Sequence, residues 1–316
     1  MGGPMFLNLI KKTKISAVGV DLSEANRATV QAKVEEGERE RERDGGAVSV
    51  RIGDSAELAS VLSETSTLVT MLPNGAAVTS VVEQALAAWR EREGEAGAEG
   101  RLIVDCSTID PATVRTLGAA AADDGHSLVD APVSGGVNGA AQGTLTFMVG
   151  ADPAANPALY DRVSTLLQPM AGNIVACGGA GNGQVAKLAN NLVLACSMIG
   201  VSEAFALASS LGLSPSLLHP ILSTSTARCW SVDSYCPVPG VMEGVPAERD
   251  YEGGFGVSLM LKDLTLANRA AASGGVPLPL GGSALQTYSL MEKIGLGTKD
   301  FGVVHRVLSG GERKKE

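Results

Sequence analysis

The chain changes character a little past the middle of its 316 residues. Up to about residue 178, short and continuous apolar segments alternate with Ala-rich segments of helical composition. Apolar runs of this length are typical of strands that are buried on both faces. Beyond that point only helical patterns follow, punctuated by Gly and Pro. Strand–helix alternation favours a mostly parallel, doubly wound sheet. The sequence therefore predicts an α/β domain over residues 1–179 and an all-helical domain over residues 180–316.

The expected elements can be placed by residue. Strands are expected at Ile15–Asp21, Val48–Ile52, Thr67–Leu72, Leu102–Asp105, Ser127–Asp130, Leu145–Gly150 and Asn173–Cys177. Helices between them are expected at Glu57–Leu62, Ala77–Trp89 and Pro111–Ala122. The helices of the second domain are expected at Gly183–Leu211, Pro215–Ser223, Val257–Ser273 and Gly281–Ile294.

Composition excludes several classes of partner. A formal net charge of −9 would repel nucleic-acid phosphates, so we expect no nucleic-acid partner. The three histidines are scattered without metal-ligand spacing, so we expect no metal site. No continuous apolar run reaches the roughly 20 residues that a membrane span needs, so we expect no membrane partner. The five cysteines form no Cys-x-x-Cys pair, which is typical of buried thiols in a reducing compartment.

One lysine stands at the start of the long apolar helix. The segment Gly181–Asn191 reads GNGQVAKLANN, and Leu188–Ser202 contains no charged residue. Such a helix is usually buried on nearly all sides. Lys187 and Asn191 lie one turn apart on the same face. Because burial favours the neutral amine, Lys187 is suited to proton transfer. The alternative is a lysine whose stem lies on apolar surface while its amine stays in water.

Two neighbouring strands end in polar or turn-forming residues. Met71-Leu72-Pro73-Asn74 ends one strand, and Asp105-Cys106-Ser107-Thr108 ends the next. Ligands bind open α/β sheets at the carboxyl ends of their strands, so we interpret both segments as parts of a binding site. Ordinary turn chemistry is the alternative for either segment alone.

A third strand end carries a hydroxyl followed by two glycines. Asp130-Ala131-Pro132-Val133 leads to Ser134-Gly135-Gly136. Backbone amides without side chains, next to a hydroxyl, form a pocket for a carboxylate or another oxyanion. The alternative is a flexible hairpin turn.

The first residues suggest part of a dinucleotide site. Such folds place a glycine-rich turn before their first helix and an acidic residue about 20 positions later. Gly2 and Asp21 have about this separation. The carboxylate would accept hydrogen bonds from the adenosine ribose and would repel a 2′-phosphate. The alternative for Asp21 is that it merely starts the next helix.

A charged pair interrupts a later apolar helix. Lys262 and Asp263 stand within Leu261-Lys262-Asp263-Leu264. Surface ion pairs contribute little stability, and such a pair is the alternative to a functional role.

Taken together, these segments resemble a known family. The whole chain is similar to the 3-hydroxyisobutyrate dehydrogenases, a branch of the β-hydroxyacid dehydrogenase superfamily. The resemblance is carried by MGGPMFLNLIKK, TMLPN, DCSTIDPATV, DAPVSGGVNGAAQGTLTFMVG, GAGNGQVAKLANNLVLACSMIG, ARCWSVDSYCPVPGVMEGVP and GGFGVSLMLKDLTLA. The serine-glycine-glycine and lysine-asparagine motifs are shared with sister reductases of glyoxylate, succinic semialdehyde and tartronate semialdehyde. The CWSVDSYCPVPGV segment is narrower and resembles the 3-hydroxyisobutyrate branch.

The resemblance implies a reaction and its residues. It implies NAD-dependent oxidation of 3-hydroxyisobutyrate to methylmalonate semialdehyde, a step of valine breakdown, with Lys187 as catalytic acid/base. The residues implied to bind substrate are Ser134, Gly135, Gly136 and Asn191. The residues implied to bind NAD are Gly2, Asp21, Leu72, Pro73, Ala77, Thr108 and Lys262. Relatives often carry a polar or charged residue where this chain has Ala77, so a contact there would use backbone or methyl.

Assembly and location are further expectations. The long apolar helix is too hydrophobic for the surface of a lone monomer, so we expect a homo-oligomer. Eukaryotic members of the family work in mitochondria, which implies a mitochondrial location.

The start of the chain departs from the family pattern. Relatives read as a strand followed by Gly-x-Gly-x-Met-Gly, and this chain begins at that methionine. We therefore expect a sheet without its first strand, and a native protein that extends upstream. Two alternatives stay open: a related semialdehyde reductase, or a non-catalytic oligomerisation module without a working cofactor site.

Overall fold

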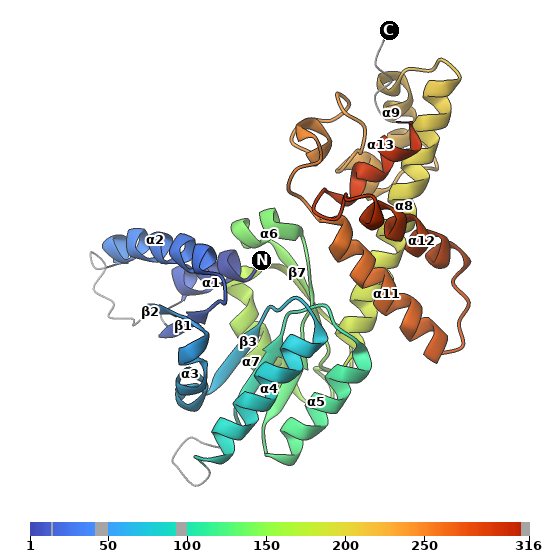
Figure 1. Ribbon diagram of the computed structural model, residues 1–316. Helices are drawn as coiled ribbons and strands as arrows, with labels where there is room; N and C mark the ends of the chain where they lie inside the picture. Colours follow the sequence, from blue (N-terminus) through green and yellow to red (C-terminus); the bar gives the residue numbers. More distant parts are fainter. Residues whose placement is uncertain (14, 42–49, 93–99, 311–316) are drawn as a thin grey trace. The chain divides into compact units, whose positions relative to one another are not determined.

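The chain divides into two compact units, Met1–Lys187 and Leu188–Glu316 (Figure 1). The computed structural model describes residues 1–13, 15–41, 50–92 and 100–310. In the described residues the first unit alternates strands with helices, and the second contains helices without strands. The predicted order, an α/β domain followed by an all-helical one, is confirmed.

The first unit follows the predicted segments closely. Its helices are α1 (Gly2–Lys12), α2 (Glu24–Arg41), α3 (Leu58–Glu64), α4 (Gly75–Arg90), α5 (Pro111–Asp123), α6 (Gly136–Gln142) and α7 (Pro157–Leu167). Its strands are β1 (Ala17–Val20), β2 (Val50–Gly53), β3 (Thr67–Thr70), β4 (Leu102–Asp105), β5 (Ser127–Asp130), β6 (Val133–Ser134), β7 (Leu145–Val149) and β8 (Ala171–Ala176). The start of the strand predicted at Val48–Ile52 lies outside the described residues. The short β6, and the helices α2, α6 and α7, were not predicted.

The described strands form three groups instead of one continuous sheet. Parallel pairs join β1 to β2, and β3 to β4 to β5. The third group has β6 antiparallel to β7 and β7 parallel to β8. No hydrogen-bonded pairing among the described strands links β1 to β3. Backbone bonds from Gly150 N to Asp130 O (2.7 Å) and from Met148 N to Pro132 O (3.0 Å) continue β5 into β7.

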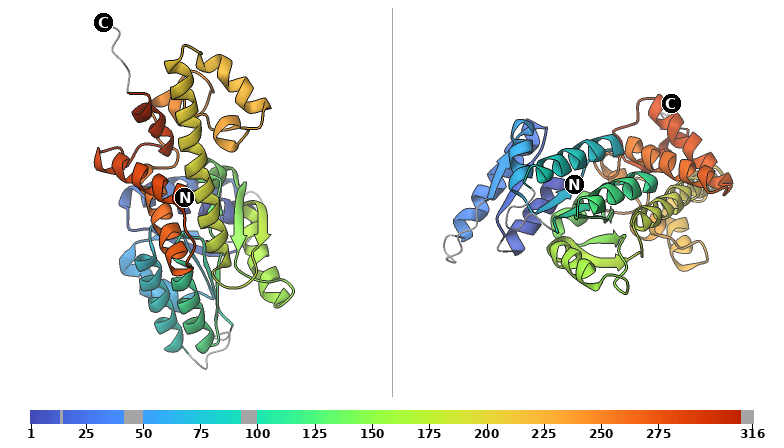
Figure 2. Two further views of the ribbon diagram at one scale, coloured as in Figure 1. Left: turned by 90° about the vertical axis from the view of Figure 1, so that its right-hand side faces the viewer. Right: turned by 90° about the horizontal axis from the view of Figure 1, so that it is seen from below.

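β4 lies at the centre of the first unit. All four of its residues are buried. Leu102 and Val104 belong to a cluster with residues of α1 and β7. Ile103 points the other way, into a cluster with residues of α4 and α5. Figure 2 shows α4 and α5 side by side over this second face. Burial on both faces explains why the strand reads as an unbroken apolar run.

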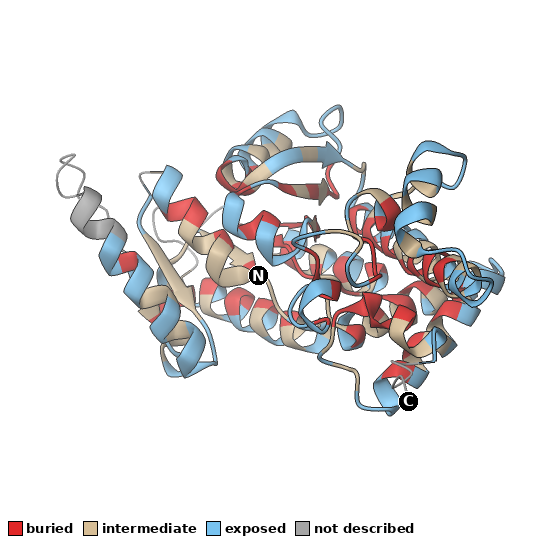
Figure 3. Ribbon diagram, turned by 90° about the horizontal axis from the view of Figure 1, so that it is seen from above, coloured by how far each residue is buried: buried red, intermediate tan, exposed pale blue. Residues whose placement is uncertain are grey.

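α1 packs one face against the core of the first unit. Met5 and Leu9 enter the core of the first unit. The side-chain amide of Asn8 donates to Ala140 O at 2.7 Å, and Lys12 Nζ donates to Pro169 O at 2.8 Å. α1 is therefore fixed against α6 and against the turn before β8. Its neighbour α2 is mostly exposed and buries Val34 alone among its described side chains (Figure 3).

The second unit is built around one long helix. Its helices are α8 (Asn182–Ser210), which starts in the first unit, α9 (Pro215–Thr224), α10 (Trp230–Asp233), α11 (Val257–Ser273), α12 (Pro279–Lys293) and α13 (Val304–Leu308). Ala195 and Met198 of α8 share a core with Val257 and Met260 of α11.

The expected burial of α8 on nearly all sides is wrong for this chain. The helix buries one stripe, and Val193 and Leu207 on its other faces are 68% and 63% exposed. One stripe against α11 and α12 cannot cover apolar side chains that surround the helix. By length and hydropathy alone, α8 is the one described helix that could cross a membrane. Its buried stripe, however, belongs to the core of the second unit.

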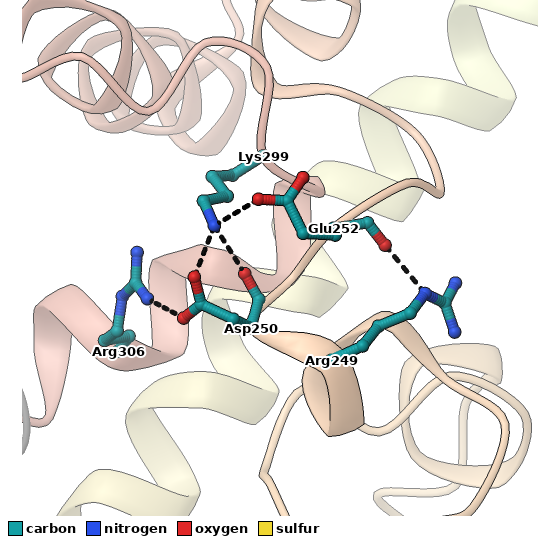
Figure 4. A network of polar contacts seen from close by, with 5 residues as sticks. All are labelled: Arg249, Asp250, Glu252, Lys299 and Arg306. Carbon is teal, nitrogen blue, oxygen red and sulfur yellow. Dashed lines mark hydrogen bonds and ion pairs between the residues drawn. The ribbon is translucent and has the colours of Figure 1, made fainter.

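A strained turn in the second unit is held by charged side chains (Figure 4). Asp250 and Tyr251 have positive φ angles of 53° and 58°. Lys299 Nζ donates to Asp250 O at 2.9 Å and to Glu252 Oε1 at 2.6 Å, and it also pairs with the Asp250 carboxylate. Arg306 pairs with the other carboxylate oxygen. The hydrogen bond from Lys299 is the main cause that lowers the pKa of Asp250. These contacts hold two non-glycine residues in a left-handed conformation.

Candidate functional site

The ends of β3 and β4 are joined by a buried polar network. Thr70 Oγ1 donates to Asp105 Oδ1 at 2.8 Å, and Ser107 N donates to the same oxygen at 3.1 Å. Ser107 Oγ accepts from Leu72 N at 2.9 Å. Burial raises the pKa of Asp105 to about 6. The two predicted strand-end segments, with Leu72 and Thr108, therefore lie at one edge of the sheet.

The predicted N-terminal residues reach the same edge. Gly2 begins α1, and a Cβ placed on it would lie 3.7 Å from Met71 Cβ. Burial lowers the pKa of the Met1 amino group, and the charge of Asp21 opposes this. The start of α1, Asp21 and the end of β3 thus lie close together. A helix start without side-chain bulk suits a pyrophosphate, and a carboxylate beside it suits a ribose. These residues fit a dinucleotide.

Asp21 also shapes the local chain. Its carboxylate accepts from Ser23 N at 2.8 Å and from Asn26 Nδ2 at 3.2 Å, and α2 begins at Glu24. Asp21 therefore does help to start the next helix, as the alternative interpretation predicts. The carboxylate is exposed, so this local role leaves it accessible to a ligand.

Pro73 and Ala77 lie where β3 passes into α4. Pro73 is exposed. Ala77 lies in the first turn of α4, and its N–H donates to the Asn74 side chain at 3.0 Å. Asn74 is the N-cap of α4, and this bond satisfies one of the helix's free amide groups. Because its N–H is already bonded, a contact from Ala77 to a cofactor would use its methyl group.

The serine-diglycine segment is a strand-to-helix junction, and the hairpin-turn alternative is wrong. Ser134 ends β6, paired with Thr146, and α6 begins at Gly136. Gly135 and Gly136 have φ angles of 132° and 64°, which other residues rarely adopt. A Cβ on Gly135 would also lie 3.0 Å from Leu145 Cδ2. The backbone requires both glycines, and both are exposed.

The start of α8 is fixed on the ends of β4 and β5. Asp130 is fully buried, and its carboxylate accepts from Gly181 N at 2.8 Å and from Gln184 N at 2.9 Å. Burial raises the pKa of Asp130, and these backbone bonds oppose the rise. Gln184, also fully buried, accepts from Ile109 N at 3.0 Å and donates to Ser107 O at 2.8 Å. Sequence reasoning missed both residues. The glycines around GNGQ were a signal that the backbone comes close to a neighbour here.

Lys187 lies on the next turn of α8 and is 8% exposed. A lysine that keeps its amine in water would be more exposed than this. Burial therefore argues against a lysine that keeps its amine in water, and the role in proton transfer stays a prediction.

Asn191, Lys262 and Asp263 meet within the second unit. Asn191 Nδ2 donates to Asp263 Oδ2 at 2.5 Å, and Lys262 Nζ lies 3.0 Å from Asp263 Oδ1. Asp263 is 3% exposed, so the surface ion pair considered for Lys262 and Asp263 is wrong. A buried carboxylate needs such partners because burial of a lone charge is costly. The arrangement orients both the Asn191 amide and the Lys262 amine.

Two further observations concern metals and thiols. Within the described residues, no group of three His, Cys, Asp or Glu side chains could hold a metal ion. All five cysteines are free thiols, and burial raises the pKa of the Cys106 thiol.

Sequence profiles of two dehydrogenase domains cover almost the whole chain. Residues 1–179 match the NAD-binding domain of 6-phosphogluconate dehydrogenase, and residues 181–308 match the NAD-binding domain of NADP-dependent 3-hydroxyisobutyrate dehydrogenase. The probable mitochondrial 3-hydroxyisobutyrate dehydrogenase of Dictyostelium discoideum is 43% identical over 314 residues, covering 98% of this chain and 88% of that protein. The human mitochondrial enzyme is 45% identical over 252 residues, covering 79% and 72%. The chain belongs to the 3-hydroxyisobutyrate dehydrogenase family.

Solved structures agree with this family. The 3-hydroxyisobutyrate dehydrogenase of Mycobacterium tuberculosis, solved with L-serine, is 37% identical with a TM-score of 0.82, covering 98% of this chain and 95% of that one. Psf3, solved with NADP+, shares the fold at 20% identity and a TM-score of 0.71. The family member described here is thus a nicotinamide-dinucleotide-dependent dehydrogenase with a Rossmann-type domain followed by a helical domain, as predicted.

Proposed function

We propose that this dehydrogenase oxidises 3-hydroxyisobutyrate to methylmalonate semialdehyde with NAD, and that Lys187 is its general base. The substrate comes from the names of the curated relatives, and the place in valine breakdown follows from it. The observation that carries the proposal is the position of Lys187. It is a buried amine one turn beyond a helix start that is hydrogen-bonded to the ends of β4 and β5.

The cofactor residues proposed are those gathered around the start of α1 and the end of β3. Gly2 and the start of α1 would approach the pyrophosphate, and Asp21 would accept hydrogen bonds from the ribose. Leu72, Pro73, Ala77 and Thr108 would line the site. Lys262 is also proposed as a cofactor-binding residue. When bound, the nicotinamide accepts a hydride from the hydroxyl-bearing carbon of the substrate.

The protein's own groups would handle the substrate and its proton. Ser134, with the backbone amides of Gly135 and Gly136, would hold the carboxylate. Asn191, oriented by Asp263, would hold the hydroxyl. As the hydride leaves carbon, the hydroxyl proton must leave oxygen, and the neutral amine of Lys187 would take it. General base catalysis of this kind contributes on the order of 10² to 10⁴ in rate.

The preference for NAD would come from Asp21. A carboxylate at this position repels the 2′-phosphate of NADP. We further propose that the functional boundary lies between residues 179 and 180, where the chain enters α8. The mitochondrial location is proposed from the names of the eukaryotic relatives.

An NADH titration followed by a turnover assay tests the function. Saturable quenching or enhancement of NADH fluorescence, with turnover of 3-hydroxyisobutyrate and NAD, supports the dehydrogenase. An absence of NADH binding would favour the non-catalytic module instead. Faster turnover of glyoxylate, succinic semialdehyde or tartronate semialdehyde with NADH would make the chain a related reductase. L-serine belongs in the same panel, because the Mycobacterium tuberculosis relative was solved with it.

A further inference from the structure

Two buried side chains connect α8 to the sheet, and neither belongs to the proposed cofactor or substrate sites. We propose that Asp130 and Gln184 are positioning residues that set where the Lys187 amine lies relative to the ends of β4 and β5. This inference rests on the proposed role of Lys187. All of the residues in the argument belong to the first unit.

The contact between α8 and the sheet leaves no room for adjustment. A Cβ on Gly183 would lie 2.2 Å from Met148 O and 2.8 Å from Asp130 Oδ2. A Cβ on Gly150 would lie 1.9 Å from Asp130 Oδ1. The helix backbone therefore rests directly on the Asp130 carboxylate and on the β7 backbone, without intervening side chains.

Asp130 fixes the height of the helix above β5. Its two carboxylate oxygens accept from different amides, Gly181 N and Gln184 N. Amides at the start of a helix lack partners within the helix, so a carboxylate there satisfies them and complements the helix dipole. Because the carboxylate is fully buried, water cannot replace it.

Gln184 fixes the rotation of the helix about its own axis. Its amide bonds to both Ile109 N and Ser107 O, the residues on either side of Thr108. Ser107 in turn accepts from Leu72 N, so the network reaches the proposed cofactor edge. The two amide contacts hold Gln184 against the β4 end, and any rotation of α8 would break them.

The position of Lys187 follows from the position of the first turn of α8. Residues three and four apart in a helix lie on one face, so Lys187 lies on the face that carries Gln184 and Gly183. A small displacement of the first turn would carry the amine with it. A misplacement of about 1 Å can lower a rate on the order of 10²-fold.

The decisive experiment is a double-mutant cycle between Gln184 and Lys187. Gln184→Met keeps the approximate volume of the side chain and removes both hydrogen bonds. We expect it to lower kcat about 10- to 100-fold, while the NADH dissociation constant and the substrate KM change little. In a Lys187→Ala background the same substitution should cost little of the residual activity, because no amine remains to be misplaced. Equal losses in both backgrounds would overturn the proposal, and so would a loss confined to NADH affinity.

Asp130→Asn is the second variant, and it retains one acceptor while removing the charge. We expect the same pattern, with kcat reduced and NADH affinity retained. The matched control is Asn156→Ala, which removes the N-cap bond to Leu159 N at the start of α7. It should lower the thermal midpoint without lowering kcat. If Asn156→Ala lowers kcat as much as Gln184→Met does, the effect is general destabilisation and the proposal is wrong.

The outcomes separate this inference from the proposed function. Wild-type activity in Lys187→Ala would remove the general base and both proposals with it. Loss of activity in Lys187→Ala, with wild-type kcat in Gln184→Met, would leave the proposed function intact and reject the positioning role alone.

Discussion

At the scale of single residues, one buried carboxylate of the second unit, Asp263, orients two proposed ligand-binding side chains. Asp263 receives the Asn191 amide and lies beside the Lys262 amine. Both of these partners are proposed ligand-binding residues, and both are oriented by a group that need not touch the ligand. The cost of burying Asp263 is offset by the hydrogen bond from Asn191 and by the positive charge of Lys262.

Asn191→Ala removes the donor to Asp263 and the proposed substrate contact together. We expect the KM for the hydroxy acid to rise about tenfold, because the proposed hydrogen bond to the substrate hydroxyl is lost. The NADH dissociation constant should change much less. Asn190→Ala is the neighbouring comparison: it removes the bond from Asn190 Nδ2 to Asn191 Oδ1 at 3.0 Å but leaves the bond from Asn191 to Asp263 in place, so we expect a smaller rise of KM. An equal rise of KM in both variants would contradict the role of Asn191.

Asp300 gives a pH-dependent contribution to stability. It is 1% exposed, and burial raises its pKa to about 6 although it accepts from Tyr235, Phe255 and Gly302. The unfolded chain protonates a carboxyl only near pH 4, so the folded state binds more protons between pH 4 and 6. The stabilisation by protonated Asp300 is therefore complete below pH 4 and lost as the pH rises through 6.

Urea unfolding between pH 4 and 7 measures this effect. The Asp300 contribution to the fall in unfolding free energy is about 3 kcal/mol at most, and Asp300→Asn should make the curve flatter by that amount. Asp250→Asn is the contrasting control, because the pKa of this exposed carboxyl is lowered instead of raised. It should leave the fall between pH 4 and 7 in place. An unchanged slope in Asp300→Asn would show that Asp300 titrates normally.

At the scale of elements, α8 belongs to both units: its first turns contact the sheet of the first unit, and the rest of the helix packs in the second. Its first turns rest on the sheet through Asp130 and Gln184, and its middle lies in the helical core through Ala195 and Met198. The proposed general base lies between these two parts. α8 contains two glycines, Gly183 near the sheet and Gly200 in the second unit. Alanine substitutions at these two positions should change the unfolding free energy in opposite directions.

Gly183→Ala and Gly200→Ala form a matched pair on this helix. The Gly183 methyl would meet the Met148 carbonyl oxygen at 2.2 Å, so the helix start must move. We expect a loss of about 2 to 3 kcal/mol in unfolding free energy and a fall in kcat. At Gly200 nothing lies within 4 Å of the new methyl, and alanine should stabilise the helix by about 1 kcal/mol. Urea denaturation of both variants checks the pair, and a harmless Gly183→Ala would contradict the tight contact.

The sequence predicts an element well where its local residue pattern determines it, and poorly where the element depends on pairing with a distant segment. β4 is recognisable because three apolar residues in a row precede its last residue, Asp105. α11 is predicted at its observed bounds. β6 escaped notice because two residues carry no periodicity, and its pairing with β7 is a long-range contact. α2 was missed because its mean hydropathy is low and it buries little.

The candidate site divides in the same way. Lys187, Asn191 and the serine-diglycine segment are visible because their residue types are unusual for their surroundings. Asp130 and Gln184 were missed because a polar residue at a strand end or a helix start has many ordinary roles. Only the three-dimensional contacts show that both side chains bond to distant parts of the chain.

At the scale of the whole molecule, the exposed apolar side chains of the helical unit favour assembly with a second copy. Leu207, Leu211 and Leu217 are 63%, 79% and 61% exposed. They follow one another from the end of α8 into α9. Large apolar side chains exposed on neighbouring segments are the kind of surface that an oligomer interface covers, so they favour the homo-oligomer expected from the sequence.

Light scattering after size exclusion tests the assembly. The wild-type chain should elute at a multiple of 32.2 kDa, and Leu207→Glu with Leu217→Glu should shift it toward the monomer. Leu22→Glu is the control, because Leu22 is 82% exposed but lies in the first unit. A monomeric wild-type chain would contradict the proposal.

The central claim is that the amine of Lys187 removes the substrate's hydroxyl proton. The most direct measurement is the steady-state kcat of Lys187→Ala with saturating NAD and 3-hydroxyisobutyrate, alongside its NADH dissociation constant. The account predicts a kcat lower by about 10² to 10⁴ with NADH affinity nearly unchanged. A variant that turns over at the wild-type rate would contradict it.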